Sequence, residues 1–588
     1  SPSKYKDRIL AWTIYCDGKA LDDSFELTYA QIHRAINRIG KATLKFYAGN
    51  MDEQTFDETD SNSFKPGTTI RIDAGDLKKQ HTLFEGVILE TGIKIGGKAR
   101  SQMVVECRDI AYQATQGRKN RIFEKKKDSD MIKEVLKAYG SVKVDATTYQ
   151  HPEMVQYYCS DWDFALSRAD ANGLFVCTEG KEIKVFKPKV SGSPVLTVTY
   201  GIDLIDFDGG LSGSEQYAKY EAVSWDPATQ KQVKQTASAP SLNDQGDIAI
   251  KKLAGDDSQL LQTDAPTDKS ALKEWADSQA LKAGLARYRG TFSFYGAAEA
   301  VPGSIIELKG LGKRFNGKVY VGSVTHTIEK NEWITKVSMG VPATNITEES
   351  DVVAPAAAGF LPGMEGLHIA VVKKLDGDTS KECRIQVELP WLDGDKKLLW
   401  ARFATTYATN QAGMFFLPEP GDEVVVGFIN NDPNYPIVLG GMYGSKHKPP
   451  FAYEAKNNTK AIVTRSKLTI EFDEEKKVIT IHTPAKNTIT MSDEGKSIIV
   501  ADQNKNKVVL DNGGIELSSV KDIKLTAKGN ISLSATGKVN IDAKSDVAVN
   551  GTNVKVTAKV GAKVKGNATA ELSASGQTTV KGAMVMIN

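Results

Sequence analysis

The sequence predicts a mainly β protein of several domains, in which two strand-rich regions precede a needle built from a short repeat. Runs of alternating apolar and polar residues, which are typical of strands, recur from the N-terminal region onward. A segment rich in Ala, Pro, Glu and Ser interrupts them at residues 346–362 and is expected to be a linker. An eight-residue pattern then repeats end to end over residues 522–553.

Residues 1–345 are expected to form a hub of two β-barrels with a few helices. Runs such as ATLKFY and TIRID predict strands. One helix is expected to begin at Ser160, with Asp163 completing a capping box, and another spans residues 268–287. A further helix, with Asp128 or Ser129 as its N-cap, is predicted by apolar residues at i, i+3, i+4 and i+7, namely Ile132, Val135, Leu136 and Tyr139.

Residues 363–451 are expected to form a small closed barrel of the OB-fold type. Five or six short strands in under ninety residues, one of them over residues 413–416, fit that architecture. OB-folds often bind oligonucleotides or sugars through exposed aromatic side chains. Here the aromatic candidates alternate within strands, which favours a place in the core for Trp391, Trp400 and Phe403. Residues 452–514 are expected to form a neck of further strands.

Residues 515–588 carry the octads, and each octad has two apolar residues separated by one. Eight residues at roughly 3.3 Å each give a perimeter of about 26 Å, too small to enclose a core. Three chains contributing one octad each give about 80 Å per layer, which predicts an intertwined homotrimeric β-helix. A β-meander or a low-complexity tail is the alternative. The predicted trimer core comprises Ile515, Leu517, Ile523, Leu525, Ile531, Leu533, Val539, Ile541, Val547, Val549, Val554, Val556, Val564, Leu572 and Val580.

Two features of the needle predict its surface contacts. The final apolar residues Val585, Met586 and Ile587 form a candidate docking face. From Lys521 onward ten Lys stand against four Asp or Glu, which favours a solvated β-surface over a membrane-binding one. Because separate chains would expose the octads, no folded monomer is expected.

No catalytic, cofactor-binding or metal-binding residues are predicted, so the chain is expected not to be an enzyme. The seven His and five Cys show no metal-ligand spacing, and no nucleophile elbow or phosphate-binding loop occurs. The glycine-rich loop at residues 308–318 lacks the P-loop spacing and is expected to connect a hairpin. With no secretory signal or membrane-length apolar run, the protein is expected in the cytoplasm before export by a signal-independent route.

Four separated motifs carry a family resemblance. The run GMFFLPEPGDEVVVGFINNDPNYPIVLGGMYG at residues 413–444, followed by KPPF, resembles the middle domain of the valine-glycine repeat protein G (VgrG) family. SDWDF at residues 160–164 with GLF at 173–175 resembles the hub of that family, and residues 462–474 resemble its neck. The V-x-G repeat occurs at Val549/Gly551, Val564/Gly566 and Val580/Gly582. The resemblance covers nearly the whole chain and is weakest over residues 1–150.

This resemblance implies a structural spike at the tip of a type VI secretion apparatus. The hub would seat on a hexameric, Hcp-like tube protein, and a PAAR-repeat cap would bind the tip at residues 585–587. Effectors and baseplate proteins are further implied partners; the target membrane is a transient one, nucleic acid is not expected, and the spike would pass into the target cell. The alternative is the hub-spike of a phage or phage-like extracellular contractile tail.

A rival from another class is a β-solenoid carbohydrate-active enzyme or adhesin. It would need coils of about 20 residues and a carboxylate cluster on one face. The octads carry only four carboxylates, and these do not all fall at the same position of the eight-residue repeat: Asp522, Asp542, Asp546 and Glu571.

Overall fold

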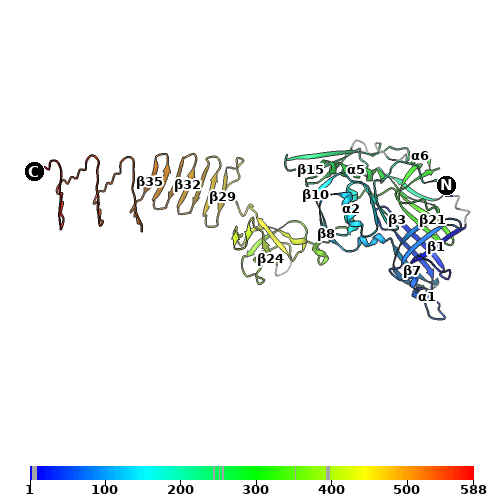
Figure 1. The fold of residues 1–588 in the computed structure, drawn as a ribbon. Helices are drawn as coiled ribbons and strands as arrows, with labels where there is room; N and C mark the ends of the chain where they lie inside the picture. The colour runs from blue at the N-terminus through cyan, green and yellow to red at the C-terminus, as the bar shows by residue number, and fades with distance from the viewer. Residues whose placement is uncertain are drawn as a thin grey trace. The chain divides into compact units, whose positions relative to one another are not determined.

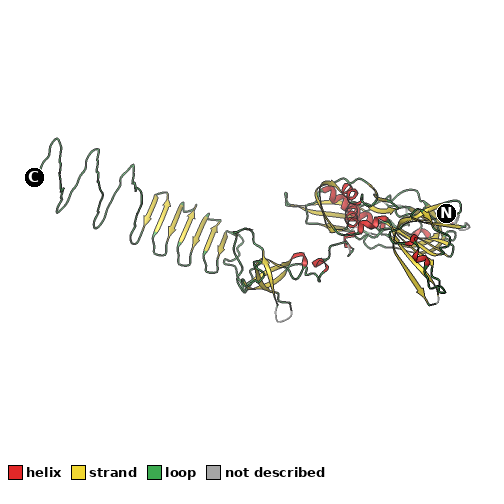
Figure 2. Ribbon diagram, turned by 60° about the horizontal axis from the view of Figure 1, so that its bottom comes forward, coloured by secondary structure: helices red, strands yellow, loops and turns green. Residues whose placement is uncertain are grey.

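The computed structural model describes residues 1–2, 9–97, 99–240, 242, 245–249, 252–253, 257–350, 352–392 and 397–587. The chain divides into two compact units, Ser1–Met442 and Tyr443–Asn588. Strands dominate both units, and the helices lie in the first (Figures 1 and 2). The prediction of a mainly β fold is therefore confirmed.

A 13-stranded sheet organises the hub, with the order β14-β18-β21-β20-β3-β4-β7-β6-β5-β1-β2 and with β13 and β19 branching from β20. The two predicted strand sets pair edge to edge through β20 and β3, where Thr325 lies opposite His33. The first set comprises β1 (Leu10–Cys16), β2 (Lys19–Ala20), β3 (Leu27–Ala35), β4 (Lys41–Tyr47), β5 (Thr69–Asp76), β6 (Gln80–Gly96) and β7 (Ala99–Arg108). The second comprises β13 (Leu196–Thr199), β14 (Leu204–Leu211), β18 (Tyr288–Tyr295), β19 (Ile305–Lys309), β20 (Gly317–Glu329) and β21 (Glu332–Met339).

Each half of this sheet has its own apolar core. Phe46, Phe64 and Ile72 belong to the core of the first half. Phe292, Phe294 and Val337 belong to the core of the second. Inward-facing residues alternate with partly exposed ones along β4 and β5, as the period-2 pattern requires.

Helices and three smaller sheets complete the hub. Ser160 caps α3, because its Oγ accepts a hydrogen bond from the Asp163 N–H at 3.0 Å, as predicted. Lys127 is the N-cap of α2, so the helix starts one or two residues earlier than expected from an N-cap at Asp128 or Ser129. The helices are α1 (Asp57–Asp60), α2 (Asp128–Leu136), α3 (Asp161–Ala171), α5 (Lys269–Leu285) and α6 (Gly312–Phe315), with 3-10 turns at Asn62–Phe64, Ile110–Thr115, Ile346–Glu348, Ala356–Gly359 and Ile429–Asn431. The smaller sheets are β8 (Lys119–Lys127) with β10 (Gln150–Cys159); β9 (Ser141–Val144) with β11 (Phe175–Glu179) and β12 (Glu182–Phe186); and β15 (Lys219–Asp226) with β16 (Lys231–Ser238) and β17 (Ser258–Gln262).

The glycine-rich loop at residues 308–318 connects a hairpin, as predicted. It joins β19 to β20, which pair antiparallel, and α6 forms one helical turn within it.

The predicted OB-type barrel is present as the closed barrel β22-β23-β24-β28-β27. Two local predictions within it were wrong. Trp391 is 51% exposed instead of lying in the core. The strand expected over residues 413–416 does not form, because the hairpin of β25 (Ala408–Thr409) and β26 (Ala412–Gly413) ends at Gly413 and leaves the next three apolar side chains exposed. The barrel strands are β22 (His368–Lys374), β23 (Arg384–Glu388), β24 (Leu398–Phe403), β27 (Glu423–Phe428) and β28 (Pro436–Gly441).

The second unit contains one seven-stranded antiparallel meander, in which each strand pairs with the next in sequence. Residues 519–587 follow it and adopt neither helix nor strand (Figure 2). The strands are β29 (Thr459–Val463), β30 (Thr469–Asp473), β31 (Val478–His482), β32 (Thr488–Ser492), β33 (Ser497–Ala501), β34 (Lys507–Asp511) and β35 (Gly514–Ser518).

Candidate functional site: an apolar sheet face

One face of the β29–β35 sheet is apolar apart from one lysine. Its pairing register aligns apolar residues in two rows across the strands. Lys460 on β29 is the one charged side chain on this face. The first row is Ile462, Ile470, Ile481, Ile489, Val500, Val508 and Leu517, and the second is Phe472, Ile479, Met491, Ile498, Leu510 and Ile515.

The opposite face of the same sheet is more polar. Of its seven mid-strand residues, Glu471, Thr480, Thr490 and Glu516 are polar, whereas Ala461, Ile499 and Val509 are apolar. Such a division between faces is expected for an antiparallel sheet with one face in a core and the other in water. The sheet therefore has the pattern of a core layer.

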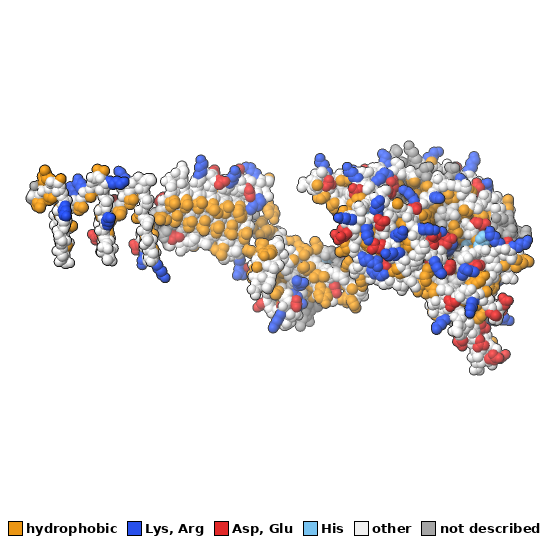
Figure 3. All heavy atoms as spheres, viewed as in Figure 1, with side chains coloured by type: hydrophobic (Ala, Val, Ile, Leu, Met, Phe, Trp, Pro, Cys, Tyr) orange, Lys and Arg blue, Asp and Glu red, His pale blue; other side chains and the backbone are white. Residues whose placement is uncertain are grey.

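No second layer of this chain covers the apolar face among the described residues. Figure 3 shows the apolar side chains as a continuous band over the strands. Ile481, Ile489 and Val500 are each about 40% exposed, and they line an open groove together with Val508, Leu517 and Ile523. Contiguous exposed apolar surface of this kind marks an interaction site.

The octads that follow are more exposed still. The predicted trimer-core residues range from 56% exposed at Ile531 to 92% exposed at Val564. Ile515 and Leu517 lie on β35, and the other predicted core residues lie within residues 519–587. At the far end Val585 is 49% and Ile587 91% exposed. A single chain brings none of these side chains into a core, so their burial among three copies stays a prediction.

The structure reveals a 19-residue repeat in the neck that the sequence analysis missed. The turns at residues 464–468, 483–487 and 502–506 have the same hydrogen bonds: the first N–H of each donates to the last carbonyl at 3.0 Å. Each turn also holds a lysine in the left-handed region, with φ of 65° at Lys467, 67° at Lys486 and 74° at Lys505. The regular spacing of these lysines, with Ile-x-Thr before the first two, could have indicated the repeat.

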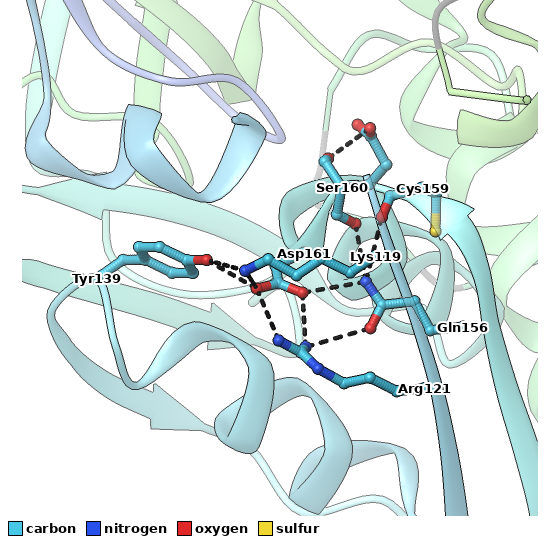
Figure 4. Close-up of polar contacts among 8 residues, drawn as sticks. Lys119, Arg121, Tyr139, Gln156, Cys159, Ser160 and Asp161 are labelled. Carbon is cyan, nitrogen blue, oxygen red and sulfur yellow. Dashed lines mark hydrogen bonds and ion pairs between the residues drawn. The ribbon is translucent and has the colours of Figure 1, made fainter. Parts of the chain in front are cut away.

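The hub contains a buried polar cluster around Asp161, the first residue of α3 (Figure 4). The Asp161 side chain is 1% exposed and accepts from Lys119 Nζ at 2.6 Å and from Arg121 Nη1 at 2.6 Å. Tyr139 Oη donates to Oδ2 at 2.7 Å and Gln156 Nε2 to Oδ1 at 3.0 Å. Burial raises the pKa of Asp161, but these hydrogen bonds outweigh burial and hold the pKa below its usual value.

This cluster joins separate elements of the hub. Its members come from β8, β10, α3 and the segment after α2, so the carboxylate links them all. Because every donor found there points at one fully satisfied carboxylate, the cluster fits a structural role better than catalysis. It lies in the SDWDF motif of the sequence.

The buried cysteines of the hub have raised thiol pKa values. Burial raises the pKa of Cys16 to about 11 and that of Cys177 to about 12. Such thiols stay protonated near neutral pH and are poor nucleophiles. In the described part of the chain, no group of three or more His, Cys, Asp or Glu is arranged to hold a metal ion.

No helix within the described residues is both long and apolar enough to span a membrane.

Two family models match successive parts of the chain. The model of the Alg8 N-terminal domain family matches residues 6–330, more than half of the chain. The model described as the type VI secretion system/phage-baseplate injector OB domain matches residues 368–443, which hold the closed barrel.

Curated relatives match over shorter segments. The type VI secretion system spike protein VgrG3 of Vibrio cholerae is 33% identical over 98 residues, 16% of this chain and 10% of the relative. VgrG5 of Pseudomonas aeruginosa is 30% identical over 125 residues, 19% of this chain and 16% of the relative. The matched segments thus span a small part of these relatives' length.

A solved type VI secretion component of E. coli, described as similar to the T4 phage tail proteins gp27 and gp5, has a TM-score of 0.37 and 13% identity. That comparison covers 73% of this chain and 99% of the E. coli chain.

Proposed function

The chain belongs to the Alg8 N-terminal domain family, and we propose that it acts as the structural spike of a contractile injection apparatus. Its resemblance to the VgrG family is confirmed by curated relatives that are themselves VgrG spike proteins and by the injector OB domain in its middle. The proposed role is mechanical, and no catalytic step belongs to it.

The observation that carries this proposal is the uncovered apolar face of β29–β35 and its continuation into the octads. Three copies that each contribute one such face would form a closed prism with an apolar interior and a polar exterior. Burying that face is strongly favourable, at about 25 cal/mol per Å² of apolar surface. A needle made in this way is stiff, because its chains cannot separate without exposing the face.

Finer contacts of the spike are part of the same proposal. The hub would seat on a hexameric, Hcp-like tube. The exposed residues Val585, Met586 and Ile587 would bind a PAAR-repeat cap, with effectors and baseplate proteins as further partners and the target membrane as a transient one. The protein would be cytoplasmic before firing and would leave through the apparatus.

The hub-spike of a phage or phage-like tail is the second candidate, because the family model of the middle domain spans both systems. Gene neighbours distinguish the two: tube, sheath, ATPase and membrane-complex genes favour secretion, whereas capsid genes favour a phage.

Sedimentation velocity of the full chain, combined with electron microscopy, tests the proposal. We expect a trimer that carries a thin rod. A folded monomer at micromolar concentration would contradict it.

A further inference from the structure

The turns of the β29–β35 sheet form two edges of opposite charge. Strands alternate in direction, so successive turns fall on alternating sides of the sheet (Figure 1). One side, here called the basic edge, comprises residues 464–468, 483–487 and 502–506. The other, the acidic edge, comprises residues 473–477, 492–496 and 511–514.

Net charge differs in sign between the edges. The basic edge has four basic residues against Asp502, a net charge of +3. The acidic edge has six acidic residues against three lysines, a net charge of −3. Its charged residues are Asp473, Glu474, Glu475, Asp493, Glu494 and Asp511, with Lys476, Lys477 and Lys496.

Key charges on both edges have no partner among the residues that the structure describes. Some acidic-edge residues pair locally, as Glu475 does with Lys456 at 3.1 Å. Among the described residues, however, the carboxylates of Glu474, Asp493 and Glu494 make no ion pair or hydrogen bond. The ammonium groups of Lys467, Lys486 and Lys505 likewise have none on the basic edge.

The lysines of the basic edge also occupy an unfavourable backbone conformation. Lys467, Lys486 and Lys505 all have φ between 65° and 74°, where Gly or Asn would fit with less strain. Lys477 and Lys496 on the acidic edge share this conformation, so it alone does not distinguish the edges. The sign of the net charge distinguishes them.

We infer that the basic edge of one copy docks against the acidic edge of the next copy in the trimer. This inference rests on the trimer proposed above. A three-fold axis along the stack of strands places unlike edges of neighbouring copies together at every corner. The two sets of turns are offset by one strand, about 4.8 Å, so the Lys486 turn would lie level with the gap between the neighbour's turns at 473–477 and 492–496. Unlike charges at every corner stabilise a head-to-tail closed ring of three.

Charge reversal in the full-length protein tests this docking. The basic-edge variant carries Lys467→Glu, Lys486→Glu and Lys505→Glu; the acidic-edge variant carries Glu474→Lys, Asp493→Lys and Glu494→Lys. Each variant alone should shift the trimer–monomer equilibrium toward monomer by at least about tenfold, given three altered pairs at each of three corners. The chain carrying all six changes should recover the wild-type equilibrium.

A matched control carries Glu471→Lys, which reverses a charge at mid-strand on the more polar face of the same sheet. This control should leave the equilibrium unchanged. Sedimentation velocity is run at about 0.1 M and about 1 M salt, where the Debye length falls from roughly 10 Å to roughly 3 Å. The effect of each single-edge variant should shrink at the higher salt.

The outcomes separate this inference from the proposed function. A wild-type chain that never trimerises contradicts the proposed function and the inference with it. A wild-type trimer that is indifferent to both reversals overturns the docking of edges alone. Loss of the trimer in both single-edge variants without recovery in the six-residue variant also overturns it, because the charges would then act on something other than each other.

Discussion

Asn487 Oδ1 accepts a hydrogen bond from the backbone N–H of Gln503 at 3.1 Å, so the side chain of one neck turn holds the next turn on the same edge. Asn506 repeats this contact one turn later, where its Oδ1 accepts from the Val520 N–H at 3.1 Å. Asparagine side chains therefore link successive turns of the basic edge, in addition to the hydrogen bonds between paired strands. The hydrogen bond from Asn506 reaches beyond β35, to the start of the octads.

Replacing Asn487 should loosen this edge. Asn487→Ala removes the bond to Gln503 and the bond from Asn487 Nδ2 to Thr483 Oγ1, at a cost of about 1 kcal/mol in the free energy of unfolding. Hydrogen exchange at the Gln503 amide should accelerate. Gln503→Ala is the control, since it keeps the N–H donor and should leave exchange slow; equal exchange rates in both variants would refute the tie.

A charge on the apolar face should block assembly. Ile489→Asp places a carboxylate where three copies would exclude water, which costs about 3 kcal/mol or more per copy. Sedimentation velocity should show monomer or aggregate in place of trimer. The neighbouring substitution Thr490→Asp points to the polar face and should preserve the trimer. A stable Ile489→Asp trimer would show that this face is not the interior.

The Asp161 cluster should stabilise the hub. Asp161→Asn keeps the size of the side chain but leaves Lys119 and Arg121 without their anion, which should lower the free energy of unfolding by about 2 kcal/mol, since both bases are partly exposed. Thermal denaturation of the hub measures this loss. Asp130→Asn, at an exposed position of α2, is the control and should change stability little.

His326 should make the hub sensitive to mild acid. Burial, aided by the positive charge of Arg34, lowers its pKa to about 3, so the folded chain keeps the ring neutral where the unfolded chain protonates it below pH 6.5. Between these two values stability falls as pH falls, by up to about 1.4 kcal/mol per pH unit.

Asp109 opposes this trend, because burial raises its pKa to about 6 and the folded chain then takes up a proton first. The test is therefore the difference in the free energy of unfolding between the wild type and His326→Gln, measured by chemical denaturation from pH 6.5 to pH 5. The stability advantage of the wild type over the variant should become smaller as the pH falls. A constant difference would mean that His326 is already protonated in the fold or never buried.

Periodic patterns made much of the architecture predictable. Alternation along β4 and β5, the cap at Ser160 and the closed barrel of residues 368–441 all follow from local residue order. The VgrG resemblance could be seen in the sequence for the same reason, since its motifs lie in short continuous runs.

Pairing between distant segments was not predictable from such patterns. β20 pairs with β3 across nearly three hundred residues, and no local signal marks that register. Trp391 alternates like a core residue, yet it lies outside the barrel wall, 5.7 Å from the His368 ring centroid. Its exposure depends on the path of the loop around it, which alternation does not encode.

The neck repeat is hard to see in the sequence because the turns on the two edges differ in length. The last turn, between β34 and β35, is two residues shorter than the earlier turns on the same edge, so the 19-residue spacing of that edge breaks after Asp511. The apolar rows survive that change because the register of pairing, and not the spacing along the chain, keeps Leu510 opposite Ile515.

The meander has a consequence for the order of folding. Each strand from β29 to β35 pairs only with its sequence neighbours, so the sheet closes short loops alone. Topologies with such local contacts fold quickly. Joining three chains is instead a collision process whose rate depends on concentration. The order of strand pairing in each neck is thus set within one chain, whereas its apolar face is covered only when three chains meet. The assembled neck would then act as a template that sets the starting register for winding the octads.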